Sequence, residues 1–548
     1  MSTKFKLPLP SLSSLKPNVP HEVSLPSLPD SKILLISQPP NAFALSPKCT
    51  HYGAPLSKGV LSPGRITCPW HGACFSLATG DVEDAPALDS LHRFDVIEEP
   101  DGVYVIADEA DLKSGRRCLK PKVRVEAATP GVVIVGRGAG AVGAMEALRA
   151  GGYGGKIVNV AKEGFRPIDR TKLSKALATD LEKLAWRGVD FYRDAAIELV
   201  TDEVTGVDFE NKKVMMKSGK EMGYEKLILS SGGTPNWLPL SGLGGELGNT
   251  FQIRTLEDSK KIVAAAGEEG GKKIVVIGSS FIGMEVGNCL ASKKHHVTIV
   301  GMEKEPMERV MGAEVGSIFR KLLEKNGVEF YLGASVEKGI PSLDGKMISA
   351  VKLADGTELP ADVVIEGVGV HPATEYLNHN SSITIEKDGS VSVDDRFAIK
   401  GVKDAYAVGD IASYPYYGPG GDGKPIRIEH WDVAQNAGRA VAQDILKPDE
   451  PPKRFIPVFW SAMGSQVRYC GTTAGSVGYD DIIIHGTTNV SEGKQSWIAY
   501  YCKGEQIVAV ATMMKDPYMA QSAELMLSDK MPTKSQIKNG SDIMSIVL

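Results

Sequence analysis

The sequence has 548 residues, seven cysteines and a net charge of −5, with 42% hydrophobic and 24% charged residues. Its length suggests about three to four domains, and its composition is that of a folded globular protein. A net negative charge argues against a nucleic-acid-binding protein, whose domains are usually basic. Seven cysteines are too few, and odd in number, for a disulfide scaffold. Apolar runs stay well short of the roughly 18–20 residues that a membrane span needs.

The first 115 residues predict a small β domain behind an irregular leader. Residues 1–20 are rich in proline and serine and lack arginine, which argues against a secretory signal and leaves a mitochondrial leader open. Over residues 21–115, short apolar runs are broken by Gly, Pro and Asp, a pattern typical of short strands and turns. Three such runs are Lys32–Ile36, Gly64–Cys68 and Gly102–Ile106. A basic stretch with proline predicts a linker over residues 116–128.

A glycine turn joins a buried strand to a helix at Gly136, Gly138 and Ala141. Gly136 permits the tight turn, Gly138 lets the backbone approach a pyrophosphate, and Ala141 allows the helix to pack closely on the strand. The free N–H groups of the helix then face the phosphates. Glu163, at the end of the next strand, is placed to bind a ribose. The motif predicts dinucleotide binding, by itself equally NAD or FAD, and a plain α/β turn is the alternative.

A second turn of the same kind follows about 140 residues later, at Gly278, Ser280 and Gly283. Ser280 replaces the usual middle glycine, which weakens the motif taken alone. The next strand ends at Gly301, where an NAD site often carries an acid, and Glu303 comes two residues late. The segment has no arginine cluster to hold a 2′-phosphate, so NADH is favoured over NADPH.

The repeated unit predicts two α/β nucleotide-binding domains. We expect the first over residues 129–253 and 386–448, and the second over residues 254–385. An α+β C-terminal domain over residues 449–548 should contain strands at Ser496–Cys502 and Gln506–Met513, followed by a helix at about 518–528.

Two mixed pairs, Cys49-Thr-His51 and Cys68-Pro-Trp-His71, stand in the β domain. Zinc fingers pair cysteine with cysteine and histidine with histidine. Mixed pairs let both thiolates bind one iron and both imidazoles the other, which is the Rieske arrangement of a 2Fe–2S cluster. A zinc site, or four unrelated residues, is the alternative. Cys74, three residues past His71, is either a further ligand or a buried thiol.

The stretch CTHYGAPLSKGVLSPGRITCPWHGACF resembles Rieske ferredoxins at nearly every position. Respiratory-type Rieske domains carry an extra disulfide-forming cysteine in each loop, where this chain has Ala54 and Trp70. The resemblance therefore implies the ferredoxin type, which has a lower potential.

Two further segments resemble flavoproteins with two dinucleotide-binding domains. AYAVGD, ending in Asp410, is similar to their second FAD fingerprint, in which the aspartate binds the ribityl and phosphate region. LSSGGTP, at residues 229–235, is similar to the turn that links their two domains. GVGVHP, which contains Gly369, resembles their second nicotinamide-site segment.

RPIDRTKLSK, which contains Arg170 and Lys175, resembles the ferredoxin-reductase and apoptosis-inducing-factor branch of that superfamily. The resemblance implies that Arg170 binds the cofactor and that Lys175 lies beside the isoalloxazine, paired with Glu285. Trp431 and Trp460 match aromatic segments that approach the flavin ring in the same branch. A structural ion pair and ordinary core packing are the alternatives for these residues.

Over residues 40 to about 530 the chain resembles Rieske-containing flavoproteins similar to apoptosis-inducing factor. The resemblance implies an NAD(P)H-dependent oxidoreductase that passes electrons from NADH through FAD to its own 2Fe–2S cluster, and then to an unidentified acceptor. Ala462 and Met463 replace an Asp-Gln pair of the ferredoxin-reductase branch, which puts docking of a separate ferredoxin in doubt.

Two other functions stay open: the electron supply of a separate oxygenase, and a redox-responsive cell-death protein in which turnover is incidental. We expect a cytoplasmic protein, with the mitochondrion as the alternative location, and leave a homodimer open.

Overall fold

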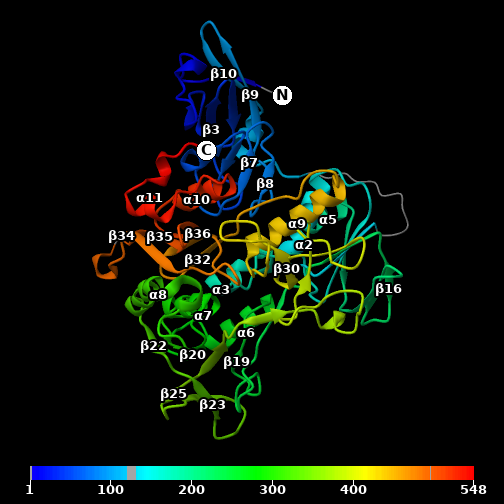
Figure 1. Cartoon of the computed structure of the whole chain (residues 1–548), viewed down its shortest axis with the longest axis vertical. Helices are drawn as coiled ribbons and strands as arrows, with labels where there is room; N and C mark the ends of the chain where they lie inside the picture. Colours follow the sequence, from blue (N-terminus) through cyan, green and yellow to red (C-terminus); the bar gives the residue numbers. More distant parts are fainter. Residues whose placement is uncertain (1–2, 120–130, 494) are drawn as a thin grey trace.

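The computed structural model describes residues 3–119, 131–493 and 495–548. The molecule is elongated, with the N-terminal β domain at one end and the second nucleotide-binding unit at the other (Figure 1). The first nucleotide-binding unit and a C-terminal sheet lie between them. Of the helices in the described part of the chain, none has the length and apolarity that a membrane crossing requires.

An outer and an inner antiparallel sheet make up the N-terminal domain. The outer sheet contains, in spatial order, β1 (Thr3–Lys6), β10 (Gly102–Ala107), β9 (Arg93–Glu99), β4 (Asn41–Leu45), β3 (Leu28–Gln38) and β2 (Pro20–Leu25). The inner sheet contains β5 (Val60–Ser62), β6 (Arg65–Thr67), β7 (Cys74–Ser76) and β8 (Val82–Asp84), and α1 (Glu109–Ser114) follows β10. The inner sheet is the one nearer to the rest of the molecule (Figure 1). The predicted all-β domain is therefore present.

The irregular leader predicted over residues 1–20 is wrong at its start. β1 pairs antiparallel with β10 over its whole length. Phe5 and Leu7 are buried in the core of the outer sheet, and this long-range packing outweighs the proline-rich composition nearby. Most of the linker predicted over residues 116–128 lies outside the described residues.

The first nucleotide-binding unit contains a parallel sheet and two helices that pack on each other. Its strands, in spatial order, are β13 (Ile197–Thr201), β12 (Ile157–Ala161), β11 (Val132–Val135), β17 (Lys226–Leu229) and β29 (Ala405–Ala407). Helix α2 (Ala139–Ala150) packs closely on α9 (Trp431–Leu446). A Cβ on Gly143 would lie 2.1 Å from the Gln435 carbonyl oxygen, and one on Gly438 would lie 2.2 Å from that of Gly140. Only glycine permits this approach of the two helices.

Shorter elements complete this unit. They are α3 (Thr171–Ala176), α4 (Leu181–Leu184), α5 (Val189–Asp194), β14 (Val204–Asp208), β15 (Lys213–Met216), β16 (Glu221–Gly223), β28 (Val391–Ser392), β30 (Ala412–Pro415) and β31 (Pro425–Ile426).

The second nucleotide-binding unit repeats the parallel-sheet plan. Its strands, in spatial order, are β19 (Thr250–Phe251), β26 (Val363–Glu366), β20 (Lys273–Ile277), β21 (His296–Gly301) and β22 (Val328–Leu332). Around it lie α6 (Leu256–Ala266), α7 (Phe281–Ser292), α8 (Glu308–Lys325), β23 (Val336–Pro341), β24 (Ile348–Leu353) and β25 (Glu358–Pro360).

The predicted limits of the second unit, residues 254 and 385, need correction. The chain crosses between the units at β18 (Gly233–Pro235) and β27 (Val370–Pro372), which pair antiparallel. β19 already belongs to the second unit's sheet, and Asn380 already donates a hydrogen bond to the Val207 carbonyl of the first. Strand pairing across the junction, which composition does not reveal, sets the boundary.

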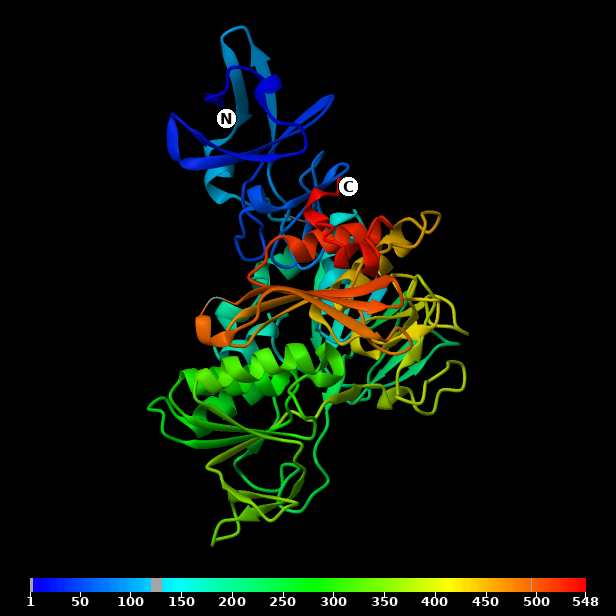
Figure 2. The ribbon, with the colours of Figure 1, turned by 60° about the vertical axis from the view of Figure 1, so that its left-hand side comes forward.

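The C-terminal region forms an antiparallel sheet covered by helices. Its strands, in spatial order, are β32 (Val458–Ala462), β33 (Gln466–Gly471), β36 (Gln506–Met513), β35 (Ser496–Lys503) and β34 (Asp481–Thr487). Its helices are α10 (Tyr518–Leu527) and α11 (Lys534–Lys538). The sheet lies between these helices on one side and the helices of the second unit on the other (Figure 2). The predicted strand pair and the helix after it are where the sequence placed them.

Buried polar contacts hold the inner end of the N-terminal domain against the other domains. Arg187 of the first unit pairs with Asp89 of the N-terminal domain at 2.6 Å and with Glu146 of α2 at 2.8 Å. All three side chains are less than 10% exposed. Thr67 donates a 2.6 Å hydrogen bond to Glu524 of α10. These contacts fix the position of the inner sheet relative to both neighbouring domains.

Candidate functional site

Two loops of the N-terminal domain have the same local structure and carry the Cys–His pairs. In each, the cysteine N–H donates to a carbonyl five residues later, and the cysteine carbonyl accepts from a glycine four residues later. Those glycines, Gly53 and Gly72, both have a φ of +78°, a conformation that glycine adopts without strain. The repeated turn brings Cys49 beside Cys68 and His51 beside His71.

The four side chains meet as a histidine pair and a cysteine pair. The Nδ1 atoms of His51 and His71 are 3.1 Å apart, and both rings are less than 10% exposed. Cys49 and Cys68 are buried. Among the described residues, no three Cys, His, Asp or Glu side chains are arranged as ligands of one metal ion. The paired arrangement gives each of two irons two ligands, so the donor set fits a 2Fe–2S cluster.

The protonation states also suit metal ligands. Burial lowers the pKa of His51 to about 4, and burial together with the charges of Arg468 and Lys175 lowers that of His71. Both imidazoles are therefore neutral at pH 7, the form that binds metal. Burial raises the pKa of Cys68, but a hydrogen bond with Cys49 and backbone N–H groups lower it overall. Those N–H groups would equally stabilise a metal-bound thiolate.

Aromatic rings from three domains surround the histidine pair. Tyr52 stacks on His51 with ring centroids 3.8 Å apart. Trp460 of β32 lies 4.3 Å from His71 on the same measure. Trp186 of the first unit lies 6.1 Å from His51 and 6.2 Å from Trp431. Trp460 was predicted as a cofactor residue, whereas sequence reasoning missed Tyr52 and Trp186.

Asp169 of the first unit fixes Tyr52 in place. The Tyr52 hydroxyl donates a short hydrogen bond to Asp169, a carboxylate that is only 2% exposed. The Lys172 ammonium lies 5.3 Å from the centre of the Tyr52 ring. Asp169 lies two residues before α3, which also carries Lys175, so one short segment contacts both Tyr52 beside the histidine pair and the cavity described next.

The first glycine turn has the geometry that a pyrophosphate needs. Gly136 has a φ of +94°, and a Cβ there would lie 2.2 Å from the Ser230 carbonyl oxygen. Beside Gly138 the space is open, since a Cβ there would meet no atom within 4 Å. Ala141 is fully buried at the first turn of α2. Free N–H groups of α2 thus end at an open space, which fits the phosphates of FAD.

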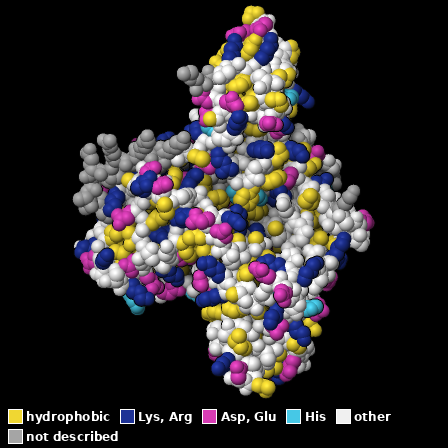
Figure 3. Space-filling view, turned by 180° about the vertical axis from the view of Figure 1, so that it is seen from behind, with side chains coloured by type: hydrophobic (Ala, Val, Ile, Leu, Met, Phe, Trp, Pro, Cys, Tyr) yellow, Lys and Arg dark blue, Asp and Glu magenta, His cyan; other side chains and the backbone are white. Residues whose placement is uncertain are grey.

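A cavity of about 750 Å³ begins at this turn and runs between the two nucleotide-binding units and the C-terminal sheet. Figure 3 shows the face seen from behind, which is hollowed near its middle where hydrophobic side chains gather. Of the predicted cofactor residues, the cavity is lined by Gly138, Arg170, Lys175, Ser280, Gly369, Asp410, Trp431 and Trp460. Glu163 is not among its lining residues, because its carboxylate pairs with Arg170.

Asp410 and Arg254 form an ion pair at the cavity wall, with an N–O distance of 3.0 Å. A Cβ on Gly232 would come within 2.7 Å of the Arg254 guanidinium. The predicted linking turn therefore leaves room for this arginine next to Asp410.

Lys175 and Glu285 are paired across the two nucleotide-binding units. The Lys175 Nζ lies 3.0 Å from a Glu285 oxygen. Ser174 and Ser461 donate hydrogen bonds to the two oxygens of the same carboxylate, which is 3% exposed. The predicted pair is thus present, and the serines compensate for the cost of burying it.

The second glycine turn is built like the first. Gly278 has a φ of +113°, and a Cβ on Gly283 would lie 1.9 Å from the Gly278 carbonyl oxygen. Ser280 precedes α7 and makes no capping hydrogen bond with its side chain. At the end of β21, a Cβ on Gly301 would lie 2.3 Å from the Ser279 hydroxyl, which explains the missing acid.

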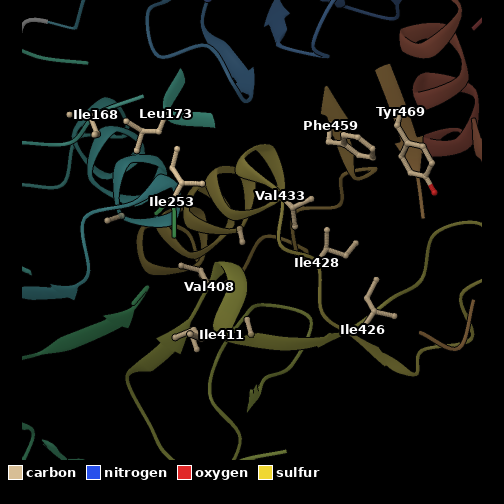
Figure 4. Close-up of a cluster of buried hydrophobic side chains, with 14 of the residues drawn as sticks. Ile168, Leu173, Ile253, Val408, Ile411, Ile426, Ile428, Val433, Phe459 and Tyr469 are labelled. Carbon is tan, nitrogen blue, oxygen red and sulfur yellow. The ribbon is translucent and has the colours of Figure 1, made fainter. Parts of the chain in front are cut away.

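Aromatic side chains close the cavity on the side of the C-terminal sheet. Phe459 and Tyr469 stack with centroids 4.8 Å apart, near Ile428 and Val433 (Figure 4). His430 packs on Phe459 at 4.5 Å, and burial lowers its pKa to about 4. Cys74 lies apart from the histidine pair on β7, where its sulfur accepts a hydrogen bond from Arg65, in agreement with a buried thiol.

Comparison with known proteins gives matches over both halves of this site. Residues 7–95 match the family described as Rieske [2Fe-2S] domain, and residues 130–438 match pyridine nucleotide-disulphide oxidoreductase. Human apoptosis-inducing factor 3 is 38% identical over 515 residues, which cover 92% of this chain and 82% of the human protein. Putidaredoxin reductase CamA of Pseudomonas putida is 30% identical over 75% of this chain and 94% of its own.

Among solved structures, the covalent putidaredoxin reductase–putidaredoxin complex is similar with a TM-score of 0.68 and 29% identity. The match covers 75% of this chain and 96% of the other. It supports the fold assigned to the nucleotide-binding units and the C-terminal sheet.

Proposed function

The chain belongs to the pyridine nucleotide-disulphide oxidoreductase family and carries a Rieske [2Fe–2S] domain. From this premise we propose that electrons pass inside the molecule from the cavity to the histidine pair, and from there to a separate acceptor protein. It is an NAD(P)H-dependent flavoprotein oxidoreductase related to apoptosis-inducing factor 3. When bound in the cavity, FAD would supply hydride acceptance and one-electron donation, and a 2Fe–2S cluster held by Cys49, Cys68, His51 and His71 would supply one-electron transfer.

The observation that carries the proposal is the position of Trp460. Its ring lines the cavity and lies 4.3 Å from His71, so a single side chain separates the two cofactor sites. Trp186 gives a second aromatic contact between the histidine pair and the cavity residue Trp431. The buried contacts of Arg187 hold this arrangement, and no domain movement is needed to bring the sites together.

The side chains that line the cavity position the nucleotides. Free N–H groups at the first turns of α2 and α7 bind the phosphates, and Asp410 and Arg170 bind the polar part of FAD. Lys175, held by Glu285, places a positive charge at the junction of the two units, where it favours a reduced, negatively charged flavin. Gly301 stands where an NAD site often carries an acid, so that position gives no preference for NADH. The preference for NADH over NADPH rests on the absence of an arginine cluster that could bind a 2′-phosphate.

Tyr52 supports the choice of a protein as the final acceptor. Its ring stacks on His51 and is 37% exposed, so it offers contact between the histidine pair and the surface. The relatives include a reductase solved in complex with its electron-carrier protein. Cytochrome c serves as a probe: its reduction by the NADH-reduced protein should slow on Tyr52→Ala, while reduction of the cluster by NADH stays unchanged.

The deciding experiment is an anaerobic titration of the purified protein with NADH, followed by visible absorption and low-temperature EPR. We expect the flavin to bleach and a Rieske-type signal to grow in the same sample. Flavin bleaching with a silent cluster would overturn the internal route and favour a binding or signalling role for the N-terminal domain.

A further inference from the structure

Arg468 is a buried cation that the predicted site does not include. It lies on β33, is 2% exposed, and pairs across the strands with Trp460 of β32. Cross-strand partners project from the same face of a sheet. Arg468 therefore stands beside the tryptophan that packs on His71.

The contacts around Arg468 leave part of its guanidinium unpaired. One terminal nitrogen lies 3.1 Å from Asp516 and donates to Gln466 at 2.9 Å. The Nε atom is buried and has no hydrogen-bond partner among the described residues. Because a buried cation is costly unless its donors are satisfied, this nitrogen points to a missing acceptor.

The nearest candidate for that acceptor is the second cluster loop. Gly72 of this loop faces Val458 of β32, and a Cβ on the glycine would lie 3.4 Å from the valine, so the loop lies directly on the sheet. Trp460, the cross-strand partner of Arg468, packs on His71 of the same loop with ring centroids 4.3 Å apart.

We propose that Arg468 balances the negative charge of the cluster held by Cys68 and His71, and thereby raises its reduction potential. Each electron taken up adds one negative charge, which a buried cation beside the ligand loop stabilises. This inference rests on the ligand set of the proposed function.

Asp516 should change the reduction potential of the cluster in the opposite direction to Arg468. Its carboxylate partly neutralises Arg468, so it should lower the potential that the arginine raises. Removing the carboxylate with Asp516→Asn leaves the arginine charge unopposed. A purely structural role for this ion pair predicts no such opposition of signs.

The test is an EPR-monitored redox titration of the full-length protein, together with iron analysis to measure cluster content. Arg468→Gln should shift the one-electron equilibrium toward the oxidised cluster by about tenfold, which corresponds to 59 mV. Asp516→Asn should shift it the other way, and Arg468→Lys should restore most of the wild-type value. Arg193→Gln is the matched control, because it changes the net charge by the same amount at a side chain that is 70% exposed.

The outcomes are distinct. An unchanged potential in Arg468→Gln with full cluster content would overturn this inference while leaving the proposed function intact. Equal shifts in the same direction for Arg468→Gln and Asp516→Asn would overturn it in favour of a packing effect. If Arg468→Gln does not fold, Asp516→Asn alone still decides the sign. Absence of a Rieske signal in the wild-type protein would instead contradict the ligand set.

Discussion

The outer and inner halves of the N-terminal domain differ in how they meet their surroundings. In the outer sheet, ion pairs such as Lys6–Asp101 are exposed and join strands within the domain. At the inner end, Arg187, Asp89 and Glu146 are buried and join different domains. The difference shows that the domain is attached through the end that holds the cluster ligands. Its attachment and its proposed chemistry therefore lie at the same end of the domain.

The largest effect is expected from His71→Ala at the inner end. Loss of an iron ligand should abolish the Rieske EPR signal, while FAD absorption persists because the cavity turns lie in another domain. His21→Ala, in the outer sheet, is the control and should keep the signal. A normal Rieske spectrum in His71→Ala would mean that the ligand set is wrong.

Arg187→Ala tests the attachment itself. It leaves Asp89 and Glu146 buried without their partner, so we expect the free energy of unfolding to fall by about 3–5 kcal/mol. Chemical denaturation followed by cluster absorbance measures the change. Lys6→Ala, which removes an exposed pair of the outer sheet, should leave the transition unchanged. Equal stability of the two variants would mean that the buried contacts at the inner end hold the domain no more strongly than the exposed pairs of the outer sheet.

Trp460→Leu tests whether the aromatic contact between the cavity and His71 carries electrons to the cluster. In stopped-flow experiments the flavin should be reduced by NADH at the wild-type rate, whereas reduction of the cluster should be several-fold slower. Trp237→Leu is the control, because Trp237 is an exposed tryptophan outside the cavity lining. Parallel slowing of both steps in Trp460→Leu would point to a distorted cavity instead.

The smallest effect is expected from Lys175→Ala, on the α3 segment that touches both sites. Loss of the ammonium should slow flavin reduction by NADH a few-fold and alter the long-wavelength charge-transfer band. Lys183→Ala, 85% exposed on α4, should change neither. Unchanged spectra and rates in Lys175→Ala would reduce its pair with Glu285 to a structural role.

Features set by neighbouring residues could be predicted from the sequence. The turns at Gly136 and Gly278 need glycine for their own backbone conformation, so the motif is visible in the chain itself. The strand Gln506–Met513 was predicted at its observed limits because its apolar run is continuous and turn residues precede it. The predicted Cys–His pairs lie together because each loop is a local turn.

Contacts between domains could not be predicted in this way. Tyr52 depends on Asp169, and Arg468 matters only because the C-terminal sheet covers the second loop. Trp186 carries no local motif, and its contact with His51 depends on the Rieske and flavin domains meeting. The strand at Thr3–Lys6 was missed for the same reason, since its partner β10 lies about a hundred residues away.

The hydrogen bond from Thr67 to Glu524 joins residues 457 positions apart. A chain made from its N-terminus has completed both cysteine–histidine loops long before β32, β33 and α10 leave the ribosome. During that interval the contacts of these loops with Trp460 of β32, and that of Thr67 with α10, cannot yet form. The contacts that the C-terminal domain makes with the inner end of the N-terminal domain are therefore among the last to form.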